Sequence, residues 1–108
     1  IVDAGMNDLM RPALYKAFHR IVATKKRKSE IRKIHDFVGP ICETTDKFLT
    51  TQSFQKLSEN DNLVICDVGA YGKVLSSNYN LRLSSIEALI KNKDIFIIKK
   101  RGRYKDII

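Results

Sequence analysis

The sequence predicts a mainly β domain, an antiparallel Greek-key-like barrel or sandwich with one or two short helices. Two observations carry this prediction. Short apolar segments rich in β-branched residues recur along the chain, separated by clusters of Gly, Pro, Asn and Asp. One segment near the start has helical spacing and candidate caps. Because 108 residues suffice for one domain and not for two, we expect residues 1–108 to form a single β domain.

In the first half of the chain we expect a helix and two strands. Residues 1–5 read as the end of a strand, and Asn7 or Asp8 as the N-cap of a helix that runs to about Phe18, with Pro12 early in it. Residues 21–23 then read as a strand that turns through a polar hairpin at 28–29. The return strand at 31–38 ends at a Gly-Pro pair.

In the second half, residues 44–60 are polar and mixed, and we expect an extended loop there with a short turn. The apolar run 63–68 predicts a buried strand that the glycines of 69–72 interrupt. Residues 76–80 read as a loop or a single helical turn. Segments 86–90 and 95–100 flank a Lys-Asn-Lys-Asp turn and predict a hairpin.

Composition restricts the class of protein. No apolar run approaches the roughly 20 residues of a membrane helix, and the first residues do not form a signal peptide. Two cysteines are too few for a disulfide framework and lack metal-ligand spacing, so we expect a reducing cytoplasm and no metal. The net charge is +8, but the sequence contains no nucleic-acid-binding motif. We therefore expect the basic residues to lie on solvated loops and expect no nucleic-acid partner. A chain that begins at Ile1 reads as a fragment or a processed product.

Cys42 and Glu43 are the adjacent pair of side chains that most strongly suggests catalytic chemistry. They follow a Gly-Pro bend, and the adjacent carboxylate disfavours the thiolate. No histidine is obviously placed to accept the proton, so the pair suits a proton donor better than a nucleophile. Taken alone, the pair also fits a surface cysteine beside an incidental glutamate.

Arg11 and Tyr15 are four residues apart, so they share a face of the predicted helix. A guanidinium beside a phenol suits a carboxylate ligand, although an exposed Arg next to a core Tyr is equally common. Tyr71 stands between Gly69 and Gly72, which permit close approach of a cofactor. The alternative for Tyr71 is a turn tyrosine that covers the core.

Four strings occur in an order that resembles the carboxy-terminal part of the diaminopimelate decarboxylases. They are residues 2–9 with 11–15, 38–43 with Asp46, 67–72, and 77–80 with Arg82. Residues 100–104 and 106–108 are similar to the last strand and tail of that family. The resemblance spans essentially the whole chain. One departure is Thr44-Thr45, which stand where the family usually has Ser-Gly.

The resemblance implies a pyridoxal-phosphate enzyme with an alanine-racemase-like fold. An amino-terminal (β/α)8 barrel would carry the cofactor, and two subunits would share each site in a homodimer. It implies that meso-diaminopimelate loses a carboxylate to give L-lysine and carbon dioxide. Cys42 would be the proton donor, and Glu43 would contact the distal ammonium of the substrate. Arg11 and Tyr15 would contact its distal carboxylate, and Tyr71 would contact cofactor and substrate.

No residue here matches the cofactor lysine of the barrel or its phosphate-binding loop, so the barrel is expected to be absent and the chain alone inactive. Two alternatives stay open. One is a related decarboxylase of a basic amino acid, which Arg11 disfavours because it would repel a cationic tail. The other is a non-catalytic orphan β domain that serves association with another chain.

Overall fold

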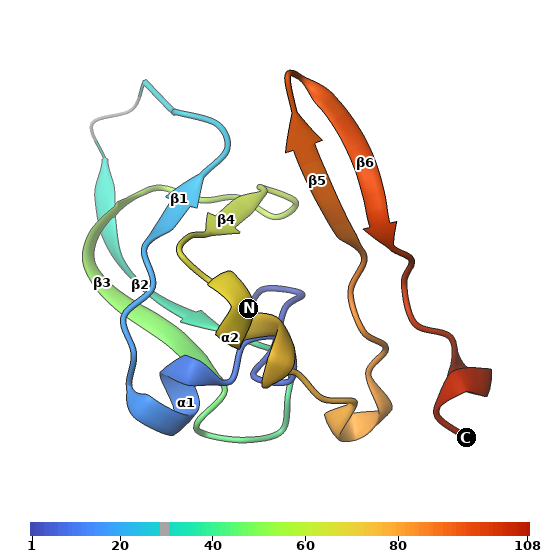
Figure 1. The fold of residues 1–108 in the computed structure, drawn as a ribbon. Helices are drawn as coiled ribbons and strands as arrows, with labels where there is room; N and C mark the ends of the chain where they lie inside the picture. Colours follow the sequence, from blue (N-terminus) through green and yellow to red (C-terminus); the bar gives the residue numbers. More distant parts are fainter. Residues whose placement is uncertain (29–30) are drawn as a thin grey trace.

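The chain folds into three separate two-stranded antiparallel sheets with two short α-helices, in a computed structural model that describes residues 1–28 and 31–108 (Figure 1). The mainly β class is confirmed. The expected closure is not found, because the three strand pairs form no closed barrel within the described residues. The elements, in chain order, are α1 (Arg11–Tyr15), β1 (Ile21–Ala23), β2 (Arg32–Val38), β3 (Lys47–Gln55), β4 (Leu63–Ile65), α2 (Gly69–Val74), η1 (Tyr79–Leu81), β5 (Glu87–Lys91), β6 (Asp94–Lys99) and η2 (Tyr104–Asp106).

The longest strand, β3, lies where the sequence predicted a loop, so that prediction was wrong. It pairs with β2, and the register shifts twice, between Lys33 and His35 and between Phe37 and Val38. Such shifts displace the alternation of inward and outward side chains. The apolar residues of β3 therefore lack the strict two-residue period by which a strand is recognised in a sequence.

The β1 strand pairs with β4, with Ile21 opposite Ile65. The predicted hairpin between β1 and β2 was therefore wrong as a pairing, and part of its turn lies outside the described residues. β4 is shorter than predicted and only half buried, since it has one neighbouring strand. Residues 1–5, expected to end a strand, belong to none, although the amide of Val2 donates to the carbonyl oxygen of Val38 at 2.8 Å.

Helix α1 is much shorter than the predicted helix and begins after Met10. The carboxylate of Asp8 accepts a bond from the Gly5 amide at 3.0 Å, so it closes a turn at residues 5–8 and does not cap the helix. Lys16 adopts a left-handed conformation (φ 54°) that ends α1.

A small core lies between these elements. It consists of buried Leu9, Ile21, Phe37 and Phe48, with Phe54 against Phe37 at a ring-centroid distance of 5.1 Å. These side chains come from residues far apart in the sequence, so the core fixes the segment before α1 relative to β1, β2 and β3.

The β5–β6 hairpin confirms the sequence prediction and stands apart from the rest of the fold (Figure 1). Asn92 and Lys93 both have positive φ, as the commonest two-residue hairpin turns require. All six residues of β6 are exposed, and Ile90 on β5 is 72% exposed. Among the described residues there is no helix long and apolar enough to cross a membrane.

Candidate functional site

The segment between β2 and β3, residues 39–46, presents Cys42 and Glu43 at the surface. Backbone bonds close this segment at its base. The amide of Gly39 donates to the carbonyl oxygen of Asp46 at 2.9 Å, and the amide of Asp46 donates to that of Glu43 at 3.1 Å. We call residues 39–46 the cysteine loop. It has a fixed base, and its two reactive side chains are open to solvent.

The side chain of Glu43 has a partner that sequence reasoning did not assign. The hydroxyl of Tyr79, in η1, donates a hydrogen bond to Oε1 of Glu43. This bond raises the pKa of Tyr79 above its ordinary value of 10.0, and the charge of Glu43 and, when its thiol is ionised, that of Cys42 act in the same direction. Cys42, Glu43 and Tyr79 therefore form one electrostatic cluster.

An open surface groove lies beside this cluster. Its lining consists of Met6, Met10, Glu43, Ser77 and Tyr79. Met10 directly precedes α1, the helix that carries Arg11 and Tyr15. The fold thus brings the cysteine loop, the turn before α1 and the η1 segment to one place, although they are distant in the sequence.

Three other predicted site residues have polar groups that bond nothing in the described part of the chain. The side chains of Arg11, Tyr15 and Tyr71 make no hydrogen bond or ion pair with any residue the structure describes. Tyr71 lies in α2 and is 68% exposed, so the turn predicted around it was wrong. Gly69 starts this helix with φ +58°, which explains why the segment resembles a turn in the sequence. Among the described residues, Tyr71 is not part of the groove lining.

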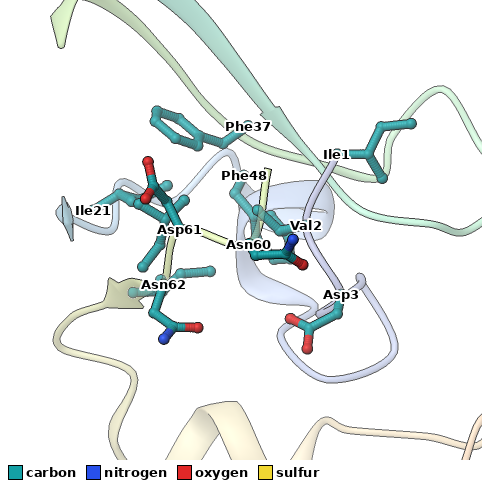
Figure 2. Close-up of a pocket in the computed structure, with 11 residues that line it drawn as sticks. Ile1, Val2, Asp3, Ile21, Phe37, Phe48, Asn60, Asp61 and Asn62 are labelled. Carbon is teal, nitrogen blue, oxygen red and sulfur yellow. The ribbon is translucent and has the colours of Figure 1, made fainter. Parts of the chain in front are cut away.

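A separate cavity of about 480 Å³ lies against the core (Figure 2). Apolar Ile21, Phe37 and Phe48 line it together with polar residues such as Asp3 and Asn60. It includes none of the predicted site residues. We interpret this cavity as the edge of the core. The candidate functional site is therefore the groove beside Cys42 and Glu43.

The lysines of the described residues lie at the surface or are only half buried. A lysine that binds an aldehyde is activated by burial. Within residues 1–28 and 31–108 no lysine is buried, and the half-buried Lys73 is paired with Glu87 at 3.6 Å. The same residues hold no cluster of potential metal ligands. Tyr71 is the one predicted cofactor contact that the chain supplies.

Two residues important to the geometry were not assigned a role from the sequence. Asp46 is 3% exposed and accepts two backbone bonds, and Tyr79 bonds Glu43. Both residues lie within the sequence segments that carry the family resemblance. For Asp46 the available signal was a short carboxylate in a turn-rich loop, a type that commonly accepts backbone amide hydrogens.

Comparison with known proteins identifies the family. Residues 1–69 match the family model described as "Pyridoxal-dependent decarboxylase, C-terminal sheet domain". This chain belongs to the pyridoxal-dependent decarboxylases. Relatives named diaminopimelate decarboxylase include one from Aquifex aeolicus, 43% identical over 100% of this chain and 26% of the relative, and one from Helicobacter pylori, 44% identical over 99% and 26%.

Solved structures of the family have the same fold. A diaminopimelate decarboxylase from Methanocaldococcus jannaschii in co-complex with L-lysine matches with a TM-score of 0.91 at 40% identity, over 98% of this chain and 24% of that chain. One from Helicobacter pylori complexed with L-lysine matches with a TM-score of 0.88, over 98% and 26%. The chain therefore spans about a quarter of the length of the relatives it matches.

Proposed function

We propose that this chain is the carboxy-terminal β domain of a diaminopimelate decarboxylase, which converts meso-2,6-diaminopimelate to L-lysine and carbon dioxide. The observation that carries the proposal is the match over 98–100% of the chain to proteins of that name, two of which were solved with L-lysine. The residue types add chemical support, because the chain carries an acidic side chain, Glu43, and a basic one, Arg11, for the two polar groups at the distal end of the substrate.

The charges suit both polar groups at the distal end of this substrate. Glu43 is an acceptor for the distal ammonium, and the Tyr79 hydroxyl fixes the orientation of its carboxylate. Arg11 is a donor for the distal carboxylate, and Tyr15 lies one helical turn further along. A substrate with a simple cationic tail would leave Arg11 opposed to a like charge. The pair Glu43 and Arg11 thus favours diaminopimelate over other basic amino acids.

Cys42 is proposed as the proton donor. After carbon dioxide leaves, the substrate carbon accepts the proton of the Cys42 thiol. Solvent then returns a proton to the thiolate. The exposure of Cys42 permits this exchange with solvent. Pyridoxal phosphate, when bound, supplies the electron sink for the decarboxylation.

The rest of the site is proposed to lie in an amino-terminal barrel and in a second subunit. The barrel would provide the cofactor lysine and phosphate site, and Tyr71 would touch cofactor and substrate. Cys42 and Glu43 would enter the pocket of the other subunit in a homodimer. The exposed apolar side chains of β5 and β6 support association with further protein surface. The two free cysteines agree with a reducing compartment, and we propose the cytoplasm.

The test is decarboxylation by the full-length protein. Purified protein with pyridoxal phosphate is expected to release carbon dioxide from meso-diaminopimelate and to form L-lysine, with much lower turnover of ornithine or arginine. Cys66→Ala is the matched control for Cys42→Ala, because Cys66 lies outside the groove. Turnover of ornithine in preference to diaminopimelate would contradict the substrate assignment.

The isolated chain provides a second test. Mixed with pyridoxal phosphate, it is expected to show no cofactor absorbance that borohydride fixes to the protein. A subunit with Cys42→Ala, combined with a subunit that lacks the cofactor lysine, is expected to recover activity in mixed dimers. An orphan domain used only for association would instead occur without any barrel in its gene, which sequencing upstream of Ile1 decides.

A further inference from the structure

We infer that Asp46 is a positioning residue that fixes the cysteine loop against the turn before α1, and so sets where Cys42 and Glu43 lie. The inference rests on the roles proposed above for Cys42 and Glu43. Asp46 lines neither the groove nor the cavity and lies outside the exposed hairpin, so we do not expect it to contact a ligand. Its role follows from what its carboxylate bonds within the chain.

The carboxylate of Asp46 accepts one backbone bond from each of two segments. Oδ2 accepts from the amide of Ile41, the residue before Cys42, at 2.7 Å. Oδ1 accepts from the amide of Met6, in the turn at residues 5–8, at 2.7 Å. Both distances are short for N–H···O bonds, as expected where the acceptor is charged. One side chain thus joins the two segments that border the groove.

Burial makes this arrangement sensitive to substitution. Asp46 is 3% exposed, so water cannot replace a bond that is lost. Gly39 lies directly against the carboxylate, and a Cβ there would overlap both of its oxygens. The Gly-Pro bend before Cys42 therefore has glycine at the position where the carboxylate needs the space. This explains why residue 39 of the loop is glycine.

The other end of the groove is tied to the same turn. The amide of Ser77 donates to the carbonyl oxygen of Asn7 at 2.8 Å. The amide of Tyr79 donates to Oγ of Ser77 at 3.3 Å, and the hydroxyl of Tyr79 bonds Glu43. A closed ring of contacts thus runs from Asp46 through the turn and η1 back to the loop. Asp46 and Asn7 are the buried members of this ring, at 3% and 1% exposure, and neither lines the groove.

The experiment compares Asp46→Asn with Asp36→Asn in the full-length protein. Asparagine keeps the size of the side chain but presents an N–H₂ group to one of the two amides, so one bond must break. Asp36 is the matched control because it is exposed on β2 and bonds Thr50 and Lys47, away from the groove. Ile21→Val serves as a stability control, since it removes one methylene from the core.

Asp46→Asn is expected to lower kcat by about tenfold to a hundredfold, because small displacements of a reacting group are costly. Alkylation of Cys42 by iodoacetamide, followed on its peptide by mass spectrometry, is expected to become several times faster. Asp36→Asn is expected to change neither quantity. Ile21→Val is expected to lower the unfolding midpoint and leave kcat and alkylation as in the wild type. A wild-type kcat and alkylation rate in Asp46→Asn would overturn the inference.

A measurement on the wild type covers the case in which Asp46→Asn does not fold. The amide hydrogens of Met6 and Ile41 are expected to exchange slowly with solvent. Rapid exchange at both amides would overturn the inference. Exchange and alkylation do not depend on the substrate, so they decide the role of Asp46 even if the protein does not decarboxylate diaminopimelate. Normal decarboxylation with an unaffected Asp46→Asn variant would reject only the role of Asp46.

Discussion

The cysteine loop and the β5–β6 hairpin differ in how far the chain itself completes them. The loop has a polar, exposed tip, yet it is held by the Asp46 carboxylate, by the backbone bond between Gly39 and Asp46, and by the Tyr79–Glu43 contact. The hairpin has regular backbone pairing, yet its apolar side chains are exposed on both faces. The hairpin thus has regular secondary structure without tertiary packing over its faces, whereas the loop has no regular secondary structure but a base fixed by tertiary contacts.

This difference shows that local regularity and tertiary completeness are separate properties. A hairpin needs a turn and two strands of suitable composition, all of which are close in sequence. Its link to the rest of the fold includes an ion pair between Lys73 and Glu87 at 3.6 Å, a partly exposed contact that contributes little to stability. The loop, by contrast, is fixed by residues that are up to 40 positions apart.

The largest expected effect is the loss of kcat when Cys42, in the cysteine loop, is replaced. Cys42→Ala in the full-length protein is expected to reduce kcat by about a hundredfold to ten-thousandfold, the usual contribution of a positioned proton donor. Cys66→Ala, in the half-buried segment after β4, is expected to retain wild-type kcat. Steady-state assays of carbon dioxide release measure both. Equal activities in the two variants would show that the loop is fixed for a reason other than the thiol.

A pair of phenylalanine substitutions sharpens the comparison in the isolated chain. Phe37 is 3% exposed and Phe96 is 51% exposed. Phe37→Ala is expected to lower the free energy of unfolding by about 3–5 kcal/mol because it leaves a cavity in the core. Phe96→Ala is expected to change it by less than about 1 kcal/mol. Urea denaturation measures both.

The same pair in the full-length protein tests what lies over the hairpin. If other protein surface covers it, the cost of Phe96→Ala rises above its value in the isolated chain. An unchanged, small cost would show that the hairpin stays exposed in the complete protein.

The Tyr79–Glu43 contact predicts a smaller, pH-dependent effect. The pKa of Tyr79 is raised in the folded state, so its stabilisation is complete below the unfolded value of about 10.0 and is lost as the pH rises through the folded pKa. Titration followed by tyrosinate absorbance is expected to contain a late phase that Tyr79→Phe removes. Tyr104→Phe is the control, because Tyr104 lies in η2. Persistence of the late phase in Tyr79→Phe would contradict the contact.

The smallest effect is expected at Thr45, where relatives of the resembled family usually have glycine. Neither Thr44 nor Thr45 has a positive φ, so the cysteine loop does not require glycine there. Thr45→Gly is expected to lower stability by about 0.5–1 kcal/mol through the greater entropy of the unfolded chain. Its kcat is expected to stay within about twofold of the wild type. A gain of stability would show that threonine strains the loop.

The sequence predicted correctly those features that depend on neighbouring residues. The hairpin around residues 91–94 and the strand at Ile21–Ala23 follow from turn residues and apolar composition. The resemblance of four ordered strings led to the family that the comparisons show. The roles of Cys42, Glu43, Arg11, Tyr15 and Tyr71 stay predictions.

The errors share a physical cause. β3 was predicted as a loop because its bulged register removes the alternation that marks a strand. The pairing of β1 with β4 joins residues about 40 positions apart, and no local pattern specifies it. Helix α1 is short because the Asp8 carboxylate bonds the Gly5 amide in the turn before it, and because Lys16 adopts a left-handed conformation after Tyr15.

By itself, the sequence determined the β class and the hairpin, because both depend on residue type and short-range order. Only the tertiary structure decided that Tyr79 bonds Glu43 and that the buried Asp46 carboxylate joins the amides of Met6 and Ile41. A hydrogen bond requires its atoms to lie within about 3 Å. For segments this far apart in the chain, only folding around a common core brings them to that distance.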